Sequence, residues 1–523
     1  MGFTVAPFTI YLLAWIAIIP PWILVQQKSL KKVILTCAMW GIGYHGLALF
    51  WITGIHPMTW MGVSWFNSLL IAIFAWFFIT AWGASLVIFW GIIFHFYLKL
   101  VNLSELKNYG SKICLKILGG ITIWCLTEKI WSYSPLWWSS ISYTQSPYNL
   151  AILQFLKISG ITTITALLIL VNGLFAESLL LSFPIISPSF SKIRGEQIFF
   201  EKEKKVNKNL TKKIISLSVI IFISAHSIGY LMYRQPLNDL PENLVKVGII
   251  QGNIPNTIKL YESGVRRALD NYKNGYEILS YGNPDLIITP ETALPLYYED
   301  IVNNTQIYQK ILDKKIPIIL GGFGKKNNGF TNSLFSIDRE AKLIGRYNKV
   351  NLVPLGEYIP FQAVLGKIID RLSPLDAHLL AGEKQQAFLT NLGKITVGIC
   401  YESAYAEHFR RQNAQGGEFI ITASNNAHYS IVMPSQHHAQ DVMRAIEGGR
   451  WMARATNTGY SGIVDPHGNT IWQSSINEFQ VYQGKIYRRQ DKTLYVLWGD
   501  WLLKLLVIGL ILSWFLILNF WKK

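Results

Sequence analysis

The chain has 523 residues, of which 51% are hydrophobic and 14% aromatic, including 19 tryptophans. Charged residues account for only 15%, well below the roughly 25% of an average soluble domain, so the composition argues against a protein that is soluble throughout. The formal net charge of +17 comes mainly from loops beside apolar runs, and it gives nucleic-acid binding little support.

Apolar runs predict membrane-spanning helices. A run of about 20 residues with few or no charges is long enough to cross the hydrocarbon core of a bilayer. Such runs lie near residues 8–25, 33–54, 67–97, 113–131, 158–181, 213–233 and 501–520. The stretch 67–97 is long for one helix, and a break near Gly83 could divide it. We therefore expect a helical membrane bundle in 1–234, a polar domain in 235–495 and a C-terminal transmembrane helix in 496–523.

Basic residues predict the orientation of these segments. Residues 201–213 are rich in lysine and are expected to form a solvated, flexible connector, whereas residues 55–66 and 132–150 contain no lysine or arginine. Because short loops rich in lysine and arginine stay cytoplasmic, the polar domain is expected outside the cytoplasm and the C-terminus inside. No basic residue precedes the first apolar run, so we expect no cleavable signal peptide.

The polar region alternates between candidate strands rich in isoleucine and valine and candidate helices. Helices are predicted at 263–280, 305–314 and 434–455. Strands are predicted at 245–251, 285–291, 316–322, 331–338, 395–401, 419–424 and 461–465. This alternation indicates an α/β layered fold.

Cys400 is the only cysteine of the polar region, because Cys37, Cys114 and Cys125 lie in or beside apolar runs. An internal disulfide is therefore excluded in this region. A lone thiol of this kind is either a small buried hydrophobe or a nucleophile.

Glu291 and Lys349, like Cys400, follow strand-like runs. Charges at strand ends usually just face solvent. A carboxylate can however take a thiol proton, and an ammonium can stabilise a developing oxyanion. The three residues lie far apart in the sequence, so only the fold could bring them together for nucleophilic acyl chemistry.

Five motifs carry a resemblance to a known family. They are Gln251-Gly252-Asn253-Ile254-Pro255, Pro290-Glu291, Tyr347-Asn348-Lys349 followed by Gly356-Glu357-Tyr358, Cys400-Tyr401-Glu402, and Arg444-Ala445-Ile446-Glu447 before Thr458-Gly459-Tyr460-Ser461. In this order they resemble the Glu-Lys-Cys enzymes of the carbon-nitrogen hydrolase (nitrilase) superfamily, and in particular its membrane-bound branch, the apolipoprotein N-acyltransferases. The resemblance covers nearly the whole chain. That family usually carries eight membrane helices, so with seven spans we expect either a truncated start or a missing first helix.

The resemblance implies a multi-pass helical bundle in the bacterial inner membrane and an αββα sandwich on the periplasmic side. It implies that Glu291 is the general base, Cys400 the nucleophile and Lys349 the cation that holds the oxyanion, with a backbone N–H near Tyr401. The expected reaction moves a fatty acyl chain from a phospholipid, through a Cys thioester, to the N-terminal α-amine of diacylglyceryl-cysteine on an apolipoprotein. This is the last step of lipoprotein maturation, and no cofactor is expected.

The resemblance also implies supporting residues. Glu357 is implied to be needed for activity, Glu402 is expected to support the triad, and Trp138 is implied to line the lipid entrance. The sequence departs from the family at Leu260, where a tryptophan is usual after Lys259, and at Asn426 and His428, where aspartate and tryptophan are usual. These changes fall in expected substrate loops and leave the triad intact.

Two other functions remain open from the residues alone. A membrane-anchored nitrilase-like amidase would use the same triad on a small amide with water as the acceptor. A non-catalytic lipid-binding scaffold would not need the three residues together. His428, His437, His438 and His467 lack the spacing of a metal site, so no metal is expected.

Overall fold

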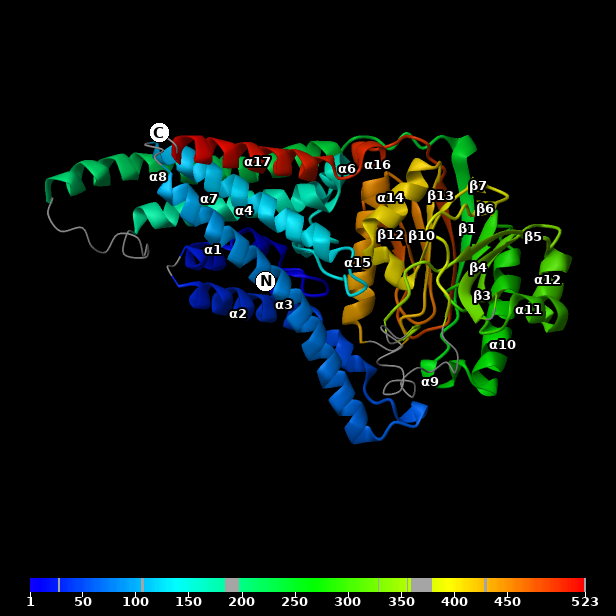
Figure 1. The fold of residues 1–523 in the computed structure, drawn as a ribbon. Helices are drawn as coiled ribbons and strands as arrows, with labels where there is room; N and C mark the ends of the chain where they lie inside the picture. The colour runs from blue at the N-terminus through cyan, green and yellow to red at the C-terminus, as the bar shows by residue number, and fades with distance from the viewer. Residues whose placement is uncertain are drawn as a thin grey trace. The chain divides into compact units, whose positions relative to one another are not determined.

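The computed structural model describes residues 1–26, 29–104, 108–183, 197–327, 329–354, 356–358, 379–427 and 430–521 (Figure 1). The chain separates into two compact units. The helical unit comprises Met1–Phe50, Phe74–Arg234 and Asp500–Lys523, and the sandwich unit comprises Trp51–Ile73 and Gln235–Gly499.

The helical unit is built from apolar helices. Within the described residues, α3, α7 and the part of α8 from Lys208 to Tyr233 are long and apolar enough to cross a membrane. Large apolar side chains such as Phe74, Phe77 and Leu512 are exposed, as expected of helices surrounded by lipid. The helices are α1 (Ile19–Val25), α2 (Leu30–Ala48), α3 (Trp65–Leu103), α4 (Tyr109–Trp131), α5 (Leu150–Leu153), α6 (Leu156–Ser159), α7 (Ile161–Ser182), α8 (Gln197–Tyr233) and α17 (Trp501–Trp521). The first part of α3, up to Ile73, belongs to the sandwich unit.

Two expectations for this unit are wrong. α3 continues through Gly83 without a break. A Cβ atom at Gly83 would lie 2.3 Å from the His45 ring, so the glycine allows α2 and α3 to pack closely and does not end the helix. Residues 201–213, expected as a flexible connector, are helical and belong to α8.

The sandwich unit contains two main β-sheets. The larger sheet has the order β13-β1-β2-β3-β4-β5, and the smaller has the order β12-β11-β10-β9-β8. The first six strands in chain order are β1 (Leu244–Gln251), β2 (Leu286–Ile288), β3 (Ile318–Lys326), β4 (Gly329–Ile337), β5 (Leu343–Asn348) and β6 (Leu389–Thr390). The others are β7 (Gly393–Lys394), β8 (Thr396–Ile399), β9 (Ile420–Ser424), β10 (Met452–Thr456), β11 (Gly462–Val464), β12 (Thr470–Gln473) and β13 (Gln480–Tyr487).

Alternating side chains of the strands fill two cores. On β3, Ile319 packs between the two sheets, whereas Ile318 and Leu320 face the helices on the outer side. α10 (Glu262–Ser280) and α12 (Gln306–Lys314) cover the larger sheet, and α14 (Ala406–Ala414) and α15 (Val432–Gly448) cover the smaller one, as Figure 1 shows. The expected αββα sandwich is confirmed.

One helix prediction in this unit is too long. α15 ends at Gly448, and Gly449 follows with a left-handed φ of 62°, a conformation that glycine adopts at little cost. Residues Met452–Thr456, predicted as the end of the helix, form β10 and pair in parallel with β9.

Candidate active site

Three strand ends bring the predicted catalytic residues together. β1, β2 and β3 are parallel, and β5 shares their direction because it is antiparallel to β4, which is antiparallel to β3. Glu291, which follows β2, and Lys349, which follows β5, therefore leave the same edge of the larger sheet. Cys400 follows β8 of the facing sheet directly.

Lys349 lies between two carboxylates. Its Nζ donates hydrogen bonds to Glu291 Oε1 and to Glu357 Oε1, each at 2.9 Å. The Lys349 side chain is 1% exposed and those of the two glutamates 8% and 13%. Such shielding from water strengthens the attraction between the charges.

Asn332 on β4 joins the same two carboxylates. Its Nδ2 donates to Glu291 Oε1 at 2.7 Å and to Glu357 Oε1 at 3.2 Å. None of the sequence motifs includes Asn332. The only signal in the sequence is an amide side chain within the strand β4, whose residues are almost all buried. Asn332 itself is 3% exposed.

Backbone N–H groups hold the remaining carboxylate oxygens. Glu291 Oε2 accepts from the backbone N–H of Asn425 at 3.0 Å. Glu357 Oε2 accepts from that of Val353 at 2.8 Å. Both carboxylates are therefore fixed on two sides.

The protonation states of these groups follow from burial and charge. Burial raises the pKa of the Cys400 thiol, and the Glu291 carboxylate, to which the thiol hydrogen-bonds, raises it further. Burial alone would raise the pKa of Glu291, but the ammonium of Lys349 lowers it overall. Burial likewise opposes the charge of Lys349, yet Glu291 and Glu357 raise its pKa well above the usual value. The site thus combines a protonated thiol, an ionised Glu291 carboxylate and a charged lysine.

Glu357 differs from Glu291 in its electrostatics. Burial raises the pKa of Glu357, Lys349 lowers it, and the nearby Glu291 carboxylate raises it again, so the result is a raised pKa. Each of two carboxylates around one ammonium makes the ionisation of the other less favourable.

The backbone at Cys400 is strained. Its φ of 52° lies in the left-handed region, which residues other than glycine seldom adopt. Cys400 begins the 3-10 turn Cys400–Ala404. His437 lies 2.8 Å from the Cys400 carbonyl oxygen, and burial lowers the pKa of His437 to about 3, so a neutral ring donates this hydrogen bond.

Glu402 ties the Cys400 turn to the Lys349 turn. One carboxylate oxygen accepts from the backbone N–H of Val350 at 2.6 Å, and the other accepts from that of Ile399 at 2.7 Å. Glu402 is fully buried. Glu402 therefore holds the backbone beside Lys349 and Cys400 in place.

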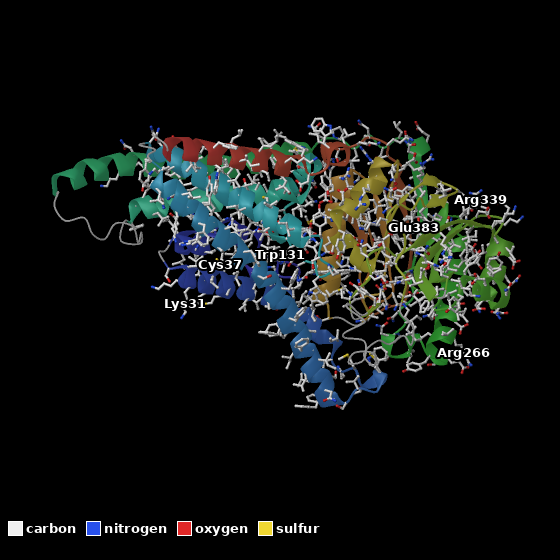
Figure 2. All side chains as sticks on the ribbon, viewed as in Figure 1. Lys31, Cys37, Trp131, Arg266, Arg339 and Glu383 are labelled. Carbon is white, nitrogen blue, oxygen red and sulfur yellow. The ribbon has the colours of Figure 1, made fainter. Side chains whose placement is uncertain are left out.

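The other sequence-predicted residues lie in different surroundings. Tyr401 follows Cys400, and its ring packs edge-on against Tyr405 with ring centres 5.3 Å apart. Trp138 belongs to the helical unit, where it is buried and lines a small pocket with His45 and Trp131, the latter labelled in Figure 2. His428 lies outside the described residues.

The remaining cysteines and histidines form no rival centre in the described residues. Cys37, labelled in Figure 2, is buried in the helical unit, and all four cysteines are free. No group of three or more His, Cys, Asp or Glu residues that could hold a metal ion occurs among the residues described. His438 instead lies 2.9 Å from Thr470 Oγ1.

Two family models match different parts of the chain. The carbon-nitrogen hydrolase family model matches residues 246–490, and the model of the apolipoprotein N-acyltransferase N-terminal domain matches residues 1–174. Among solved structures, an amidase from Nesterenkonia sp. is 17% identical, with a TM-score of 0.37, over 52% of this chain and 98% of its own.

Relatives match over the full length. The apolipoprotein N-acyltransferase of Nostoc sp. is 45% identical over 100% of this chain and 98% of its own. That of Synechocystis sp. is 44% identical over 98% of each chain. Together with the apolar helices, these matches show that the chain is a membrane protein of the apolipoprotein N-acyltransferase family.

Proposed function

We propose that this protein transfers a fatty acyl chain from a phospholipid to the N-terminal α-amine of diacylglyceryl-cysteine on an apolipoprotein. The single observation that carries this proposal is the cluster of buried Glu291 and Lys349 with the partly buried Cys400, in a chain whose full-length relatives bear the name of this activity. The hydrogen bonds around Glu291 and Lys349 support the roles of base and cation.

The first half-reaction acylates the enzyme. Glu291 takes the proton of the Cys400 thiol, and the thiolate attacks the ester carbonyl carbon of the phospholipid. The Lys349 ammonium, assisted by a backbone N–H near Tyr401, stabilises the oxyanion. When the intermediate collapses, the C–O ester bond breaks, Glu291 returns the proton to the departing lysophospholipid oxygen, and a thioester remains on Cys400.

The second half-reaction transfers the acyl group. The α-amine of the lipoprotein attacks the thioester carbonyl, and Glu291 takes a proton from the attacking nitrogen. The C–S bond then breaks, an amide forms, and the proton returns to the Cys400 sulfur. Exclusion of water from a site this buried favours the amine over hydrolysis.

The proposed reaction requires the phospholipid and the lipid-anchored apolipoprotein to lie at the same membrane surface. We propose that the protein lies in the bacterial inner membrane with the sandwich unit on the periplasmic side, because the basic loops favour this orientation. We also propose the domain limits 1–234, 235–495 and 496–523, with Trp138 lining the route of the lipid. Leu260 and the Asn426 region are proposed to influence substrate preference.

The alternative of a small-molecule amidase receives less support. Such an enzyme would need the sandwich unit but not the N-terminal domain that is matched at residues 1–174. The full-length relatives carry both parts.

A direct assay distinguishes these activities. Purified protein in detergent is incubated with phospholipid labelled in its acyl chain and a diacylated lipopeptide, or with a small amide alone. We expect the label on the lipopeptide amine, with one lysophospholipid formed for each transfer, and no transfer by Cys400→Ala. Hydrolysis of the small amide without transfer to the lipopeptide would contradict the proposal.

A further inference from the structure

Lys259 is a buried cation that the mechanism above does not use. It is the last residue of the short helix α9 (Asn256–Lys259) and is only 4% exposed. Its Nζ donates a 3.2 Å hydrogen bond to the backbone carbonyl of Glu291. Lys259 also interacts electrostatically with the Glu291 carboxylate and with Cys400.

The charge state of Lys259 follows from its surroundings. Burial lowers its pKa to about 8, while Glu291 and Cys400 oppose this change. The ammonium form therefore predominates at neutral and acidic pH. In the other direction, the charge of Lys259 contributes to the lowered pKa of Glu291.

The two carboxylates of the site need a second positive charge to balance them. Glu291 and Glu357 share the single positive charge of Lys349. The other titratable groups that act on Glu291 supply no positive charge, since Cys400 is a protonated thiol and His437 is neutral at physiological pH. Without Lys259 the cluster would carry one net negative charge. Neighbouring carboxylates in a cluster with excess negative charge bind a proton more readily. A proton on Glu291 would prevent it from acting as the base.

We propose that Lys259 is a positioning residue that supplies the second positive charge of the active site and keeps Glu291 in its ionised, proton-accepting form. The proposal rests on the proposed function in one respect, the role of Glu291 as the base for Cys400. Lys259 keeps its own proton throughout, and only the Cys400 proton moves to Glu291 and back. The hydrogen bond to the Glu291 carbonyl holds the ammonium beside the turn that carries the base.

The test measures how the reactivity of Cys400 depends on pH. Wild-type protein and Lys259→Met are treated with iodoacetamide over a range of pH, and alkylation of the Cys400 peptide is followed by mass spectrometry. Acylation by phospholipid is measured in parallel. Removing a nearby positive charge raises the pKa of a carboxyl group, so the acid limb of both profiles should move to higher pH. A shift of about one unit would slow the reaction about tenfold on that limb, and the rates should converge at higher pH.

Three further variants separate charge from structure. Lys259→Arg keeps the positive charge and should leave the acid limb close to that of the wild type. The double variant Lys259→Met with Glu357→Gln removes one charge of each sign, so its limb should return toward the wild-type position. Lys310→Met, which removes a lysine paired with Glu277 at 3.1 Å on the outer helices, should leave the profile unchanged.

Other outcomes would overturn the proposal. A loss of reactivity in Lys259→Met that is equal at every pH would reduce Lys259 to a structural residue, and an unshifted profile would remove its electrostatic role. The two proposals fail separately. A wild-type protein that accepts no acyl group from phospholipid, yet shows the shifted alkylation profile in Lys259→Met, would contradict the acyltransferase function but not the role of Lys259.

Discussion

The Tyr347 hydroxyl donates a 2.8 Å hydrogen bond to the Glu402 carboxylate and so links β5 of one sheet to the turn after β8 of the other. Lys349 lies two residues beyond Tyr347, and Cys400 lies two residues before Glu402. The same carboxylate accepts the backbone N–H groups of Val350 and Ile399. Glu402 therefore connects the turn that carries Lys349 to the turn that carries Cys400.

Glu402→Gln should lower both stability and activity. The amide replaces one acceptor oxygen with an NH2 donor, so at least one buried N–H or O–H loses its acceptor, at a cost of about 1–3 kcal/mol for each unsatisfied group. Thermal unfolding in detergent and acylation of Cys400 would measure the two effects. Glu383→Gln, at an exposed position labelled in Figure 2, is the matched control. A variant with wild-type stability and rate would show that Glu402 does not hold the two turns together.

Glu357→Gln should lower activity while the protein stays folded. The change keeps the shape of the side chain but removes the negative charge that Lys349 Nζ contacts at 2.9 Å. A loss of about 10- to 100-fold in the acylation rate is expected when a group that orients a catalytic residue is removed. Full turnover in this variant would make Glu357 dispensable for catalysis.

Asn332→Ala tests a residue that lies outside the sequence motifs. The substitution removes the hydrogen bonds to both Glu291 and Glu357. Hydrogen bonds to charged groups contribute about 1.5–3 kcal/mol, so if that energy is needed in the transition state, acylation should slow by about 10- to 100-fold. Asn303→Ala, at an exposed position of α11 (Tyr298–Asn304), provides the control. Equal rates for the two variants would mean that Asn332 does not orient the carboxylates.

Much of the sandwich could be predicted from the sequence because its central strands are buried apolar runs. β1, β4 and β9 lie within a few residues of the predicted ranges. β13 was not predicted because it is an edge strand, Gln480–Tyr487, with many polar and only partly buried residues. β10 was not predicted because its apolar residues continue the spacing of α15, and only the turn at Gly449 separates the two elements.

The candidate site was only partly predictable. Glu291, Lys349 and Cys400 follow strand-like runs, but their meeting depends on strand order and direction, which the resemblance supplied and the spacing could not. Asn332 offers only the signal of an amide within a buried strand, and Lys259 offers none, because their importance comes from contacts with Glu291 made across the fold. Burial and charge balance of this kind become visible only when distant segments are brought together.

The topology prediction can be tested by labelling single cysteines in a background in which the exposed Cys114 is replaced by serine. Arg339→Cys, at an exposed position labelled in Figure 2, should react with a membrane-impermeant thiol reagent from the periplasmic side. Lys212→Cys, exposed on α8, should react only after the inner membrane is permeabilised, because lysine-rich segments stay cytoplasmic. Labelling of the Lys212→Cys variant in unpermeabilised spheroplasts would contradict this orientation.

The most direct measurement of the central claim is the acyl group on Cys400 after incubation with phospholipid alone. We predict an adduct on the Cys400 peptide that neutral hydroxylamine removes, formed before any lipopeptide is added. Cys400→Ala should abolish both adduct and transfer, Glu291→Gln should slow adduct formation by about 10²- to 10⁴-fold, and Lys349→Ala should fail at the same step. An adduct on Cys37, Cys114 or Cys125 instead, or wild-type transfer by Cys400→Ala, would contradict the account.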